Sequence, residues 1–352
     1  MSARSRFICS GASFAIACGS GSAVIPQQSA VIRTLAAMVS YATSTAVAQD
    51  AYPSRAIQII VPNPPGGLNQ ITAQPLSAVI EKLYKQPAPV VNKPGATAAV
   101  GTAYVATQKP DGYNILVTTP NIYLVVEKNR AQHVESPYRL DQLQPLALTS
   151  ADPLVLTVQT ESPYRSVKDF IADAKLKAGQ LAYSSSGPFG ITHVPFAMFT
   201  EAAGLRMRHV PTTGGGPAVM QLLGGHVQAT GGGLGAVAPH IKAGKLRALA
   251  SWGARRHASL PDVATFDELG YDLEAYLWVG LFTTAGVPEP TLKAMRQLIQ
   301  HVMKDPLYRQ AIEKSNVEID YRDTPEFVRF FQADYERLAP AVERLAREEK
   351  KS

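Results

Sequence analysis

The sequence predicts an α/β fold in which parallel-rich sheets are flanked by helices, and three observations support this prediction. Strand-like runs alternate with helix-like runs from residue 52 onward, which is the pattern of β-α units with parallel strands. The composition, 46% hydrophobic and 18% charged, is typical of a globular protein. The length of 352 residues allows two or more domains, and no internal repeat interrupts the chain after residue 48.

In the first part of the chain, three strand-like runs each precede a helix. The run "AIQIIVP" precedes a helix from about Asn69, "APVVNK" precedes "TAAVGTAYVATQ", and "NILVTT" precedes a helix start at Pro120-Asn121. Pro75 falls inside the first of these helices. Because proline lacks a backbone donor, Pro75 predicts either a kink or a later helix start.

The second part follows the same order. The run "PLVLTVQT" precedes "SVKDFIADAKLKAG", "QLAYSS" precedes "ITHVPFAMFTEAAG", and "HVQATG" precedes "LGAVAPHIKAG". Near the C-terminus, Thr324-Pro325-Glu326 indicates an N-cap and a first-turn proline, so we expect a long helix through about Arg347.

Residues 1–48 differ from the rest and are typical of a secretory signal. They contain three arginines, no acidic residue, the apolar stretch "TLAAMVSYATSTAVA" and a small-x-small end at Ala46-Val47-Ala48. Cleavage is expected after Ala48, although the segment is longer than usual. The alternative is a lipid attached to Cys18. Both cysteines lie in this segment, so the mature chain would have neither disulfides nor a thiol nucleophile.

Charge and hydropathy exclude other classes of protein. Without residues 1–48, Lys plus Arg falls from 34 to 31 and Asp plus Glu stays at 28, so the net charge falls from +6 to +3. No basic block suggests nucleic acid. No later apolar run approaches the ~20 residues of a membrane span. We therefore expect a soluble, exported protein.

The loops after the strands are rich in Gly, Ser and Thr and contain almost no charge: "NPPGGLNQ", "KPGATAAVG", "TTPN", "SSSGPFGITH", "PTTGGGPA" and "TGGGLGA". In open α/β sheets, ligands bind at this end of the strands. Backbone amides, hydroxyls and helix N-termini suit a carboxylate held without a salt bridge. The alternative for Gly66-Gly67 is a tight turn without a ligand. No phosphate-binding glycine motif is present, so a phosphate is a poorer candidate.

Catalytic and metal-binding motifs are weak. Ser185 or Ser186 with His193 suggests a nucleophile and a base, but no nucleophile elbow or orienting carboxylate accompanies them. The histidines have no metal-ligand spacing, so no metal or cofactor is expected. Trp252 and Trp278 are interpreted as core or domain-contact residues, and Trp278 also as a candidate to line a cleft.

From Tyr52 onward the chain contains, in this order, "YPSRAIQIIVPNPPGG", "VVNKPGATAAVGTAYVATQKPDGYNILVTT", "KAGQLAYSSSGPFGITH", "HVPTTGGGPAVMQLLGGHVQA", "PHIKAGKLRALA", "SLPDVATFDELG" and "WVGLFTTAGVPEP". In these segments it resembles the solute receptors of tripartite tricarboxylate transporters, the Bug-type receptors. The resemblance covers essentially the whole mature chain. The "PDGY" turn, "PHIKAGKLRALA" and "LPDV" contribute most to it.

The resemblance implies a type II-like periplasmic binding protein with two domains, residues 52–153 plus 277–352 and residues 154–276, joined by crossing strands with a ligand cleft between them. It implies a non-enzymatic, monomeric Venus flytrap receptor that delivers a small mono- or dicarboxylate to membrane permease subunits. The expected ligand-binding residues are Pro65, Gly66, Gly67, Leu68, Asn69, Gln70, Thr118, Thr119, Asn121, Ser185, Ser186, Gly187, Thr192, Thr212 and Gly232.

Departures from the family pattern bear on the ligand. Gln70 stands where the family commonly has aspartate, and Gly232 where another aspartate is usual. Without these acids a ligand ammonium would lack a counter-charge, so amino acids are disfavoured. The Gly-rich loops leave volume for a larger, aromatic carboxylate. The alternatives to a transport receptor are a serine hydrolase or transferase, and a ligand sensor for a signalling partner.

Overall fold

A computed structural model describes residues 52–349. The expected signal segment, its cleavage after Ala48 and the alternative at Cys18 lie outside these residues. The strands form one mixed sheet in the order β2-β1-β3-β9-β4-β7-β5-β6, and β8 and β10 also pair with β4. The strands are β1 (Gln58–Val61), β2 (Val90–Asn92), β3 (Asn114–Thr118), β4 (Leu143–Gln159), β5 (Ala182–Ser185), β6 (Arg208–Pro211), β7 (Ala229–Gly233), β8 (Leu246–Ser251), β9 (Tyr276–Thr284) and β10 (Arg322–Asp323).

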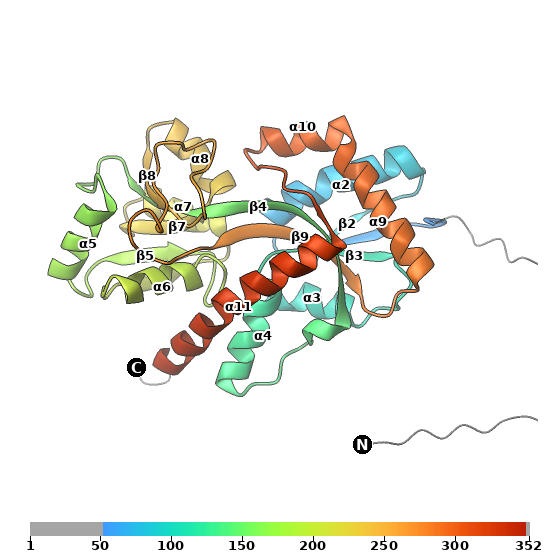
Figure 1. Cartoon of the computed structure of the whole chain (residues 1–352), viewed down its shortest axis with the longest axis horizontal. Helices are drawn as coiled ribbons and strands as arrows, with labels where there is room; N and C mark the ends of the chain where they lie inside the picture. Colours follow the sequence, from blue (N-terminus) through green and yellow to red (C-terminus); the bar gives the residue numbers. More distant parts are fainter. Residues whose placement is uncertain (1–51, 350–352) are drawn as a thin grey trace, which may run out of the picture. The chain divides into compact units, whose positions relative to one another are not determined.

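Helices cover this sheet, so the α/β prediction is confirmed. They are α2 (Leu68–Tyr84), α3 (Ala99–Ala106), α4 (Asn121–Gln132), α5 (Val167–Leu176), α6 (Val194–Ala202), α7 (Gly215–Leu223), α8 (Leu234–Lys242), α9 (Glu289–Lys304), α10 (Pro306–Lys314) and α11 (Thr324–Glu349), with a short 3-10 helix at Leu140–Gln142. Figure 1 shows α2, α9 and α10 near β2 and β3, and α5 to α8 around the opposite end of the sheet.

Parallel pairing, which the β-α pattern predicted, occurs in two separate groups of strands. Strand β1 pairs with β2 and β3, and β5 pairs with β6 and β7. The two groups are joined by antiparallel strands: β9 pairs with β3 and β4, and β4 pairs with β7 and β8. Figure 1 shows β4 and β9 running together through the middle of the molecule.

Strand β4 is longer than the sequence predicted. It begins at Leu143, whereas the strand-like run begins at Pro153. Its register against β9 shifts near Pro145 and again near Leu148. Proline and register shifts interrupt the alternation of side chains by which strands are found. Strand β4 pairs with β9 as far as Pro153 and with β7 and β8 from Leu154 onward, so it changes neighbours along its length.

Prolines bear on the predicted bounds of helices α2 and α11. Helix α2 begins at Leu68 and continues through the buried Pro75, so a later start is wrong. Helix α11 spans Thr324–Glu349, as predicted to within two residues at its C-terminal end, and the Thr324 hydroxyl donates to the Leu146 carbonyl at 2.7 Å. Both α4 and α6 pack against α11, and Figure 1 shows α11 beside α4.

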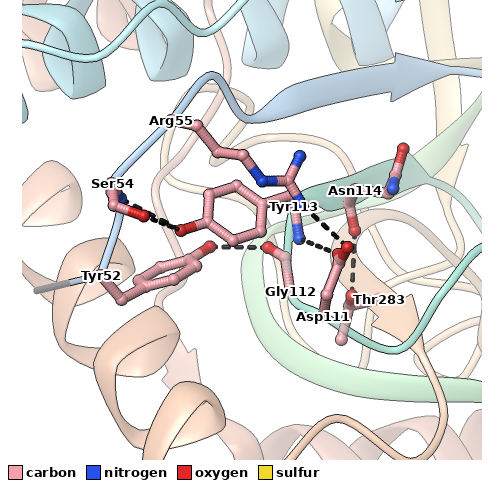
Figure 2. Close-up of polar contacts among 8 residues, drawn as sticks. All are labelled: Tyr52, Ser54, Arg55, Asp111, Gly112, Tyr113, Asn114 and Thr283. Carbon is pink, nitrogen blue, oxygen red and sulfur yellow. Dashed lines mark hydrogen bonds and ion pairs between the residues drawn. The ribbon is translucent and has the colours of Figure 1, made fainter. Parts of the chain in front are cut away.

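The "PDGY" turn holds the first described residues. The Tyr52 hydroxyl donates to the Gly112 carbonyl at 2.6 Å, and the Arg55 guanidinium contacts the Asp111 carboxylate at 2.7 Å (Figure 2). The Arg55 guanidinium also lies 3.7 Å from the centre of the Tyr113 ring. This turn therefore fixes the chain where it enters β1. Within residues 52–349, none of the helices is both long and apolar enough to span a bilayer.

Candidate ligand-binding site

A cavity of about 870 Å³ lies where the loops after six strands meet. Its walls include residues 62–69 after β1, residues 94–98 after β2, and Thr119 and Asn121 after β3. Residues 186–188, 191 and 192 follow β5, residues 212–217 follow β6, and residues 233–236 end β7 and begin α8. The volume lies in the range of small-molecule sites.

Most of the residues expected from the sequence line this cavity: Pro65, Gly66, Gly67, Leu68, Asn69, Thr119, Asn121, Ser186, Gly187, Thr192 and Thr212. They come from separate parts of the chain because each follows a different strand. Gly66 has φ of +90° and Gly187 has φ of +143°, conformations that favour glycine. The two loops therefore need glycine for backbone reasons as well.

Four expected residues do not line the cavity: Gln70, Thr118, Ser185 and Gly232. The Gln70 side-chain oxygen accepts a hydrogen bond from the Asn92 amide at 2.9 Å. Thr118 and Ser185 are fully buried at the ends of their strands. A Cβ on Gly232 would lie 2.5 Å from a Val237 methyl. Since side chains alternate along a strand, the next residue, Gly233, lines the cavity in its place.

Six helices begin at the cavity, and none of them has a side-chain cap. The helices α2, α3, α4, α6, α7 and α8 lack both a capping hydrogen bond and an acidic residue in the first turn. Four of their N-cap residues, Gly67, Ala98, Gly214 and Gly233, are cavity residues themselves. The first N–H groups of a helix have no partner within it. Loop carbonyls accept those of Ala99 and Val100 in α3 and of Val194 in α6, while the aligned peptide dipoles of all six helices direct partial positive charge at the cavity.

Helices that begin elsewhere are different. Ser166 caps α5 in a capping box with Asp169. Asp305 caps α10 through the Leu307 N–H. Helices α9 and α11 each carry a glutamate in the first turn, Glu289 and Glu326. Stabilising acids are thus present at the other helix starts and absent at the cavity, where they would repel an anion.

The cavity contains almost no charged side chains. Among the described residues that line it, Asp152 and His240 are titratable, and neither Lys nor Arg occurs. Asp152 was not among the residues expected from the sequence. It lies on β4 just before the strand-like run at Pro153, and it is 2% exposed. The chain has Gln70 and Gly232 at the two positions where the sequence comparison suggested acids, but Asp152 on β4 places a carboxyl in the cavity wall.

The sequence profile described as the tripartite tricarboxylate transporter family receptor matches residues 73–346. The chain belongs to this family. It is 31% identical over 290 residues to protein BugT of Bordetella pertussis, covering 82% of this chain and 88% of that protein. It also resembles the periplasmic binding protein BugD, at 26% identity with a TM-score of 0.72, covering 84% of this chain and 98% of that one. A TctC solute-binding protein from Polaromonas has 27% identity and a TM-score of 0.68, covering 83% and 99%.

In this family member, a hydrogen bond joins two segments of the cavity wall. The Asn121 side-chain oxygen, at the start of α4, accepts the Ile191 N–H at 3.0 Å. Nearby, Ala96, Thr97 and Ala98 have φ of +46°, +53° and +77°. Left-handed conformations are uncommon for such residues, and Thr97 is β-branched. A Cβ on Gly187 would lie 3.8 Å from the Thr97 hydroxyl, so the loops after β2 and β5 approach each other here.

The receptor does not form the serine–histidine pair considered from the sequence. His193 Nδ1 accepts the Phe189 N–H at 2.9 Å, and the Ser186 hydroxyl bonds to the Thr192 hydroxyl at 2.7 Å. Ser185 is instead 2.7 Å from His209 Nε2. Burial lowers the pKa of His193 to about 3 and that of His209 to about 4. Both imidazoles are therefore neutral at pH 7.

The tryptophans are core residues. Trp278 is fully buried, and its indole N–H donates to Asp334 at 2.6 Å. Trp252 is 1% exposed and packs against Phe266 and Phe199. Neither lines the cavity. Within the described part of the chain, no group of three or more His, Cys, Asp or Glu side chains is placed to hold a metal ion.

Proposed function

We propose that this protein is an extracytoplasmic receptor that binds a small organic mono- or dicarboxylate and delivers it to the membrane permease subunits of a tripartite transporter. Family membership supports the receptor role. The observation that carries the carboxylate is the group of six uncapped, acid-free helix N-termini at one cavity. Export through the signal segment accompanies this role, and an intact mass that starts at Gln49 would support it.

A carboxylate suits these helix starts because its oxygens are only acceptors. Hydrogen bonds from N–H groups to an ionised carboxylate are roughly twice as strong as bonds between neutral groups. The helix dipoles add attraction without a charged side chain. The volume of about 870 Å³ also admits an acid larger than a four-carbon one, including an aromatic acid.

We also propose that residues 52–153 with 277–352, and residues 154–276, act as two domains that close on the ligand. The change of neighbours along β4 at Pro153 and Leu154 supports a boundary there. A ligand that contacts both sides binds the closed form better and shifts the population toward it. Solution scattering should then give a smaller radius of gyration with ligand, and an unchanged radius at saturation would contradict closure.

The carboxylate is tested by comparing an acid with its amide. A primary carboxamide has nearly the same shape, but it loses the charge and points an NH₂ group at protein donors. We expect the amide to bind about a hundredfold more weakly, which corresponds to about 2.7 kcal/mol. Calorimetric titration of an acid that raises the melting temperature, and then of its amide, measures this. Equal affinities would show that the helix starts do not hold a carboxylate.

A further inference from the structure

One carboxyl group faces a cavity that is otherwise suited to anions. Asp152 lies on β4 opposite Leu277 of β9, and both residues line the cavity. Its Oδ1 atom accepts the Glu318 N–H at 3.3 Å and lies 3.8 Å from His257 Nε2. No described residue donates a hydrogen bond to its Oδ2 atom. The side chain is therefore anchored through one oxygen, and the other remains open for a donor from the cavity.

His257 lies next to the Asp152 carboxylate. The imidazole is 9% exposed, its Nε2 atom is 3.1 Å from Glu318 Oε2, and it lines a neighbouring cavity of about 590 Å³. Asp152 and His257 thus lie side by side between two cavities, and each lines a different one. The Asp152 carboxylate beside it raises the pKa of His257, while burial raises the pKa of Asp152. A buried carboxylate needs such a partner to remain charged.

The same cavity contains a second acceptor without a donor. Asn69, at the start of α2, is 3% exposed and donates through its amide nitrogen to the Asn63 side-chain oxygen at 2.6 Å. Its own side-chain oxygen is buried and has no hydrogen-bond partner. An unpaired buried acceptor is costly unless a ligand supplies the donor. Asp152 on β4 and Asn69 on α2 therefore each offer an acceptor to which a ligand can donate. The helix N-termini, in contrast, favour a ligand group that accepts.

A ligand that is only a carboxylate would meet like charge at Asp152. We propose that Asp152 is a specificity-determining residue, and that the preferred ligand is an organic acid that also carries a hydroxyl or ammonium group, which donates to Asp152 Oδ2. This inference rests on the proposed carboxylate receptor function. It reverses the expectation that amino acids are disfavoured, because β4 supplies the acid that positions 70 and 232 lack.

Two matched sets of acids test the proposal on the intact mature protein. The first is succinate, malate and aspartate, and the second is 3-phenylpropanoate, 3-phenyllactate and phenylalanine. Within each set the carbon skeleton is constant and carbon 2 carries hydrogen, a hydroxyl or an ammonium. In the set that fits, we expect the hydroxyl or ammonium member to bind at least tenfold more tightly than the unsubstituted acid by calorimetry. The two substituted members distinguish between the donors.

The variant Asp152→Asn should reduce this preference to within about twofold while the unsubstituted acid binds as well or better. Asp334→Asn is the matched control, since Asp334 is an equally buried carboxyl that bonds to Tyr123 and Trp278 away from the cavity. Its preference should be that of the wild type.

If Asp152→Asn does not fold, binding of the acids to the wild type alone still tests the role of Asp152. An unsubstituted acid that binds as tightly as its relatives would overturn the role of Asp152 and leave the receptor function intact. A preference that persists in a folded Asp152→Asn variant would also overturn it. If no member of either set binds, the carboxylate receptor function fails, and this inference fails with it.

Discussion

Asn121 shows how a single side chain stabilises the site. Its oxygen accepts the buried Ile191 N–H, which joins the start of α4 to the loop after β5. Asn121→Ala would leave that N–H unpaired, at a cost of about 1–3 kcal/mol. We expect a loss of that size in the free energy of unfolding by denaturant. Asn129→Ala, on the same helix, should change it by less than about 0.5 kcal/mol. Equal stabilities of the two variants would show that the bond contributes nothing.

At this scale, local chemistry predicted part of the site and missed the rest. The Gly66-Gly67 turn was predictable because glycine and proline act on the residues beside them. Asp152 was not, because its position in the cavity wall depends on the pairing of β4 with β9 and on His257, about a hundred residues later in the chain. Asn69 and Gln70 were both expected at the site, and in the structure Asn69 lines the cavity whereas the side-chain oxygen of Gln70 accepts a hydrogen bond from Asn92.

At the scale of elements, the start of α2 is the clearest test of the anion site. Gly67 is its N-cap, with φ of −88°, and a Cβ there would meet nothing within 4 Å, so other residues fit. Gly67→Asp and Gly67→Asn should cap the helix about equally well. The aspartate adds a like charge beside the ligand carboxylate, worth ~1 kcal/mol at 4 Å in water and ~4 at an effective dielectric of 20.

We therefore expect Gly67→Asp to bind the acid at least about tenfold more weakly than Gly67→Asn, with equal melting temperatures. Calorimetric titration and thermal unfolding measure the two quantities. If both variants bind alike, α2 does not direct its N-terminus at the carboxylate.

The elements differ in how far the sequence predicts them. Strands β1, β3 and β5 and the helices after them follow from alternating runs, because each unit is local. The first ten residues of β4 did not follow, because Pro145 and the register shifts hide them, and they form a strand only by pairing with β9 and β10. The long central strand is therefore a tertiary feature, and so is the cavity wall that it forms.

At the scale of the whole molecule, the buried histidines predict sensitivity to acid. The rings of His193 and His209 stack with centres 3.7 Å apart, and burial lowers their pKa values to about 3 and about 4. In the unfolded chain both would titrate near 6.5. Their contribution to stability is therefore complete above pH 6.5 and is lost as the pH falls toward 4, because the unfolded state then binds more protons.

His257 acts in a different range. The neighbouring Asp152 carboxylate raises its pKa above 6.5, so its contribution is complete below pH 6.5 and is lost as the pH rises through the higher value. Asp152 opposes His193 and His209 near pH 4, because burial raises its pKa and so favours its protonated form in the fold. The clearest acid response should therefore appear between about pH 6 and pH 5.

His193 is 5% exposed and should dominate that response. It should contribute a slope of about 1.4 kcal/mol per pH unit in the free energy of unfolding, and the half-buried His209 should add less. His193→Gln retains an acceptor for the Phe189 N–H but removes the titrating group, so its unfolding free energy should vary less between pH 6 and pH 5. The exposed His226→Gln provides the control, with the wild-type slope expected. Urea unfolding at half-unit steps of pH measures all three proteins, and a His193→Gln slope as steep as that of His226→Gln would show that His193 is not the source of acid sensitivity.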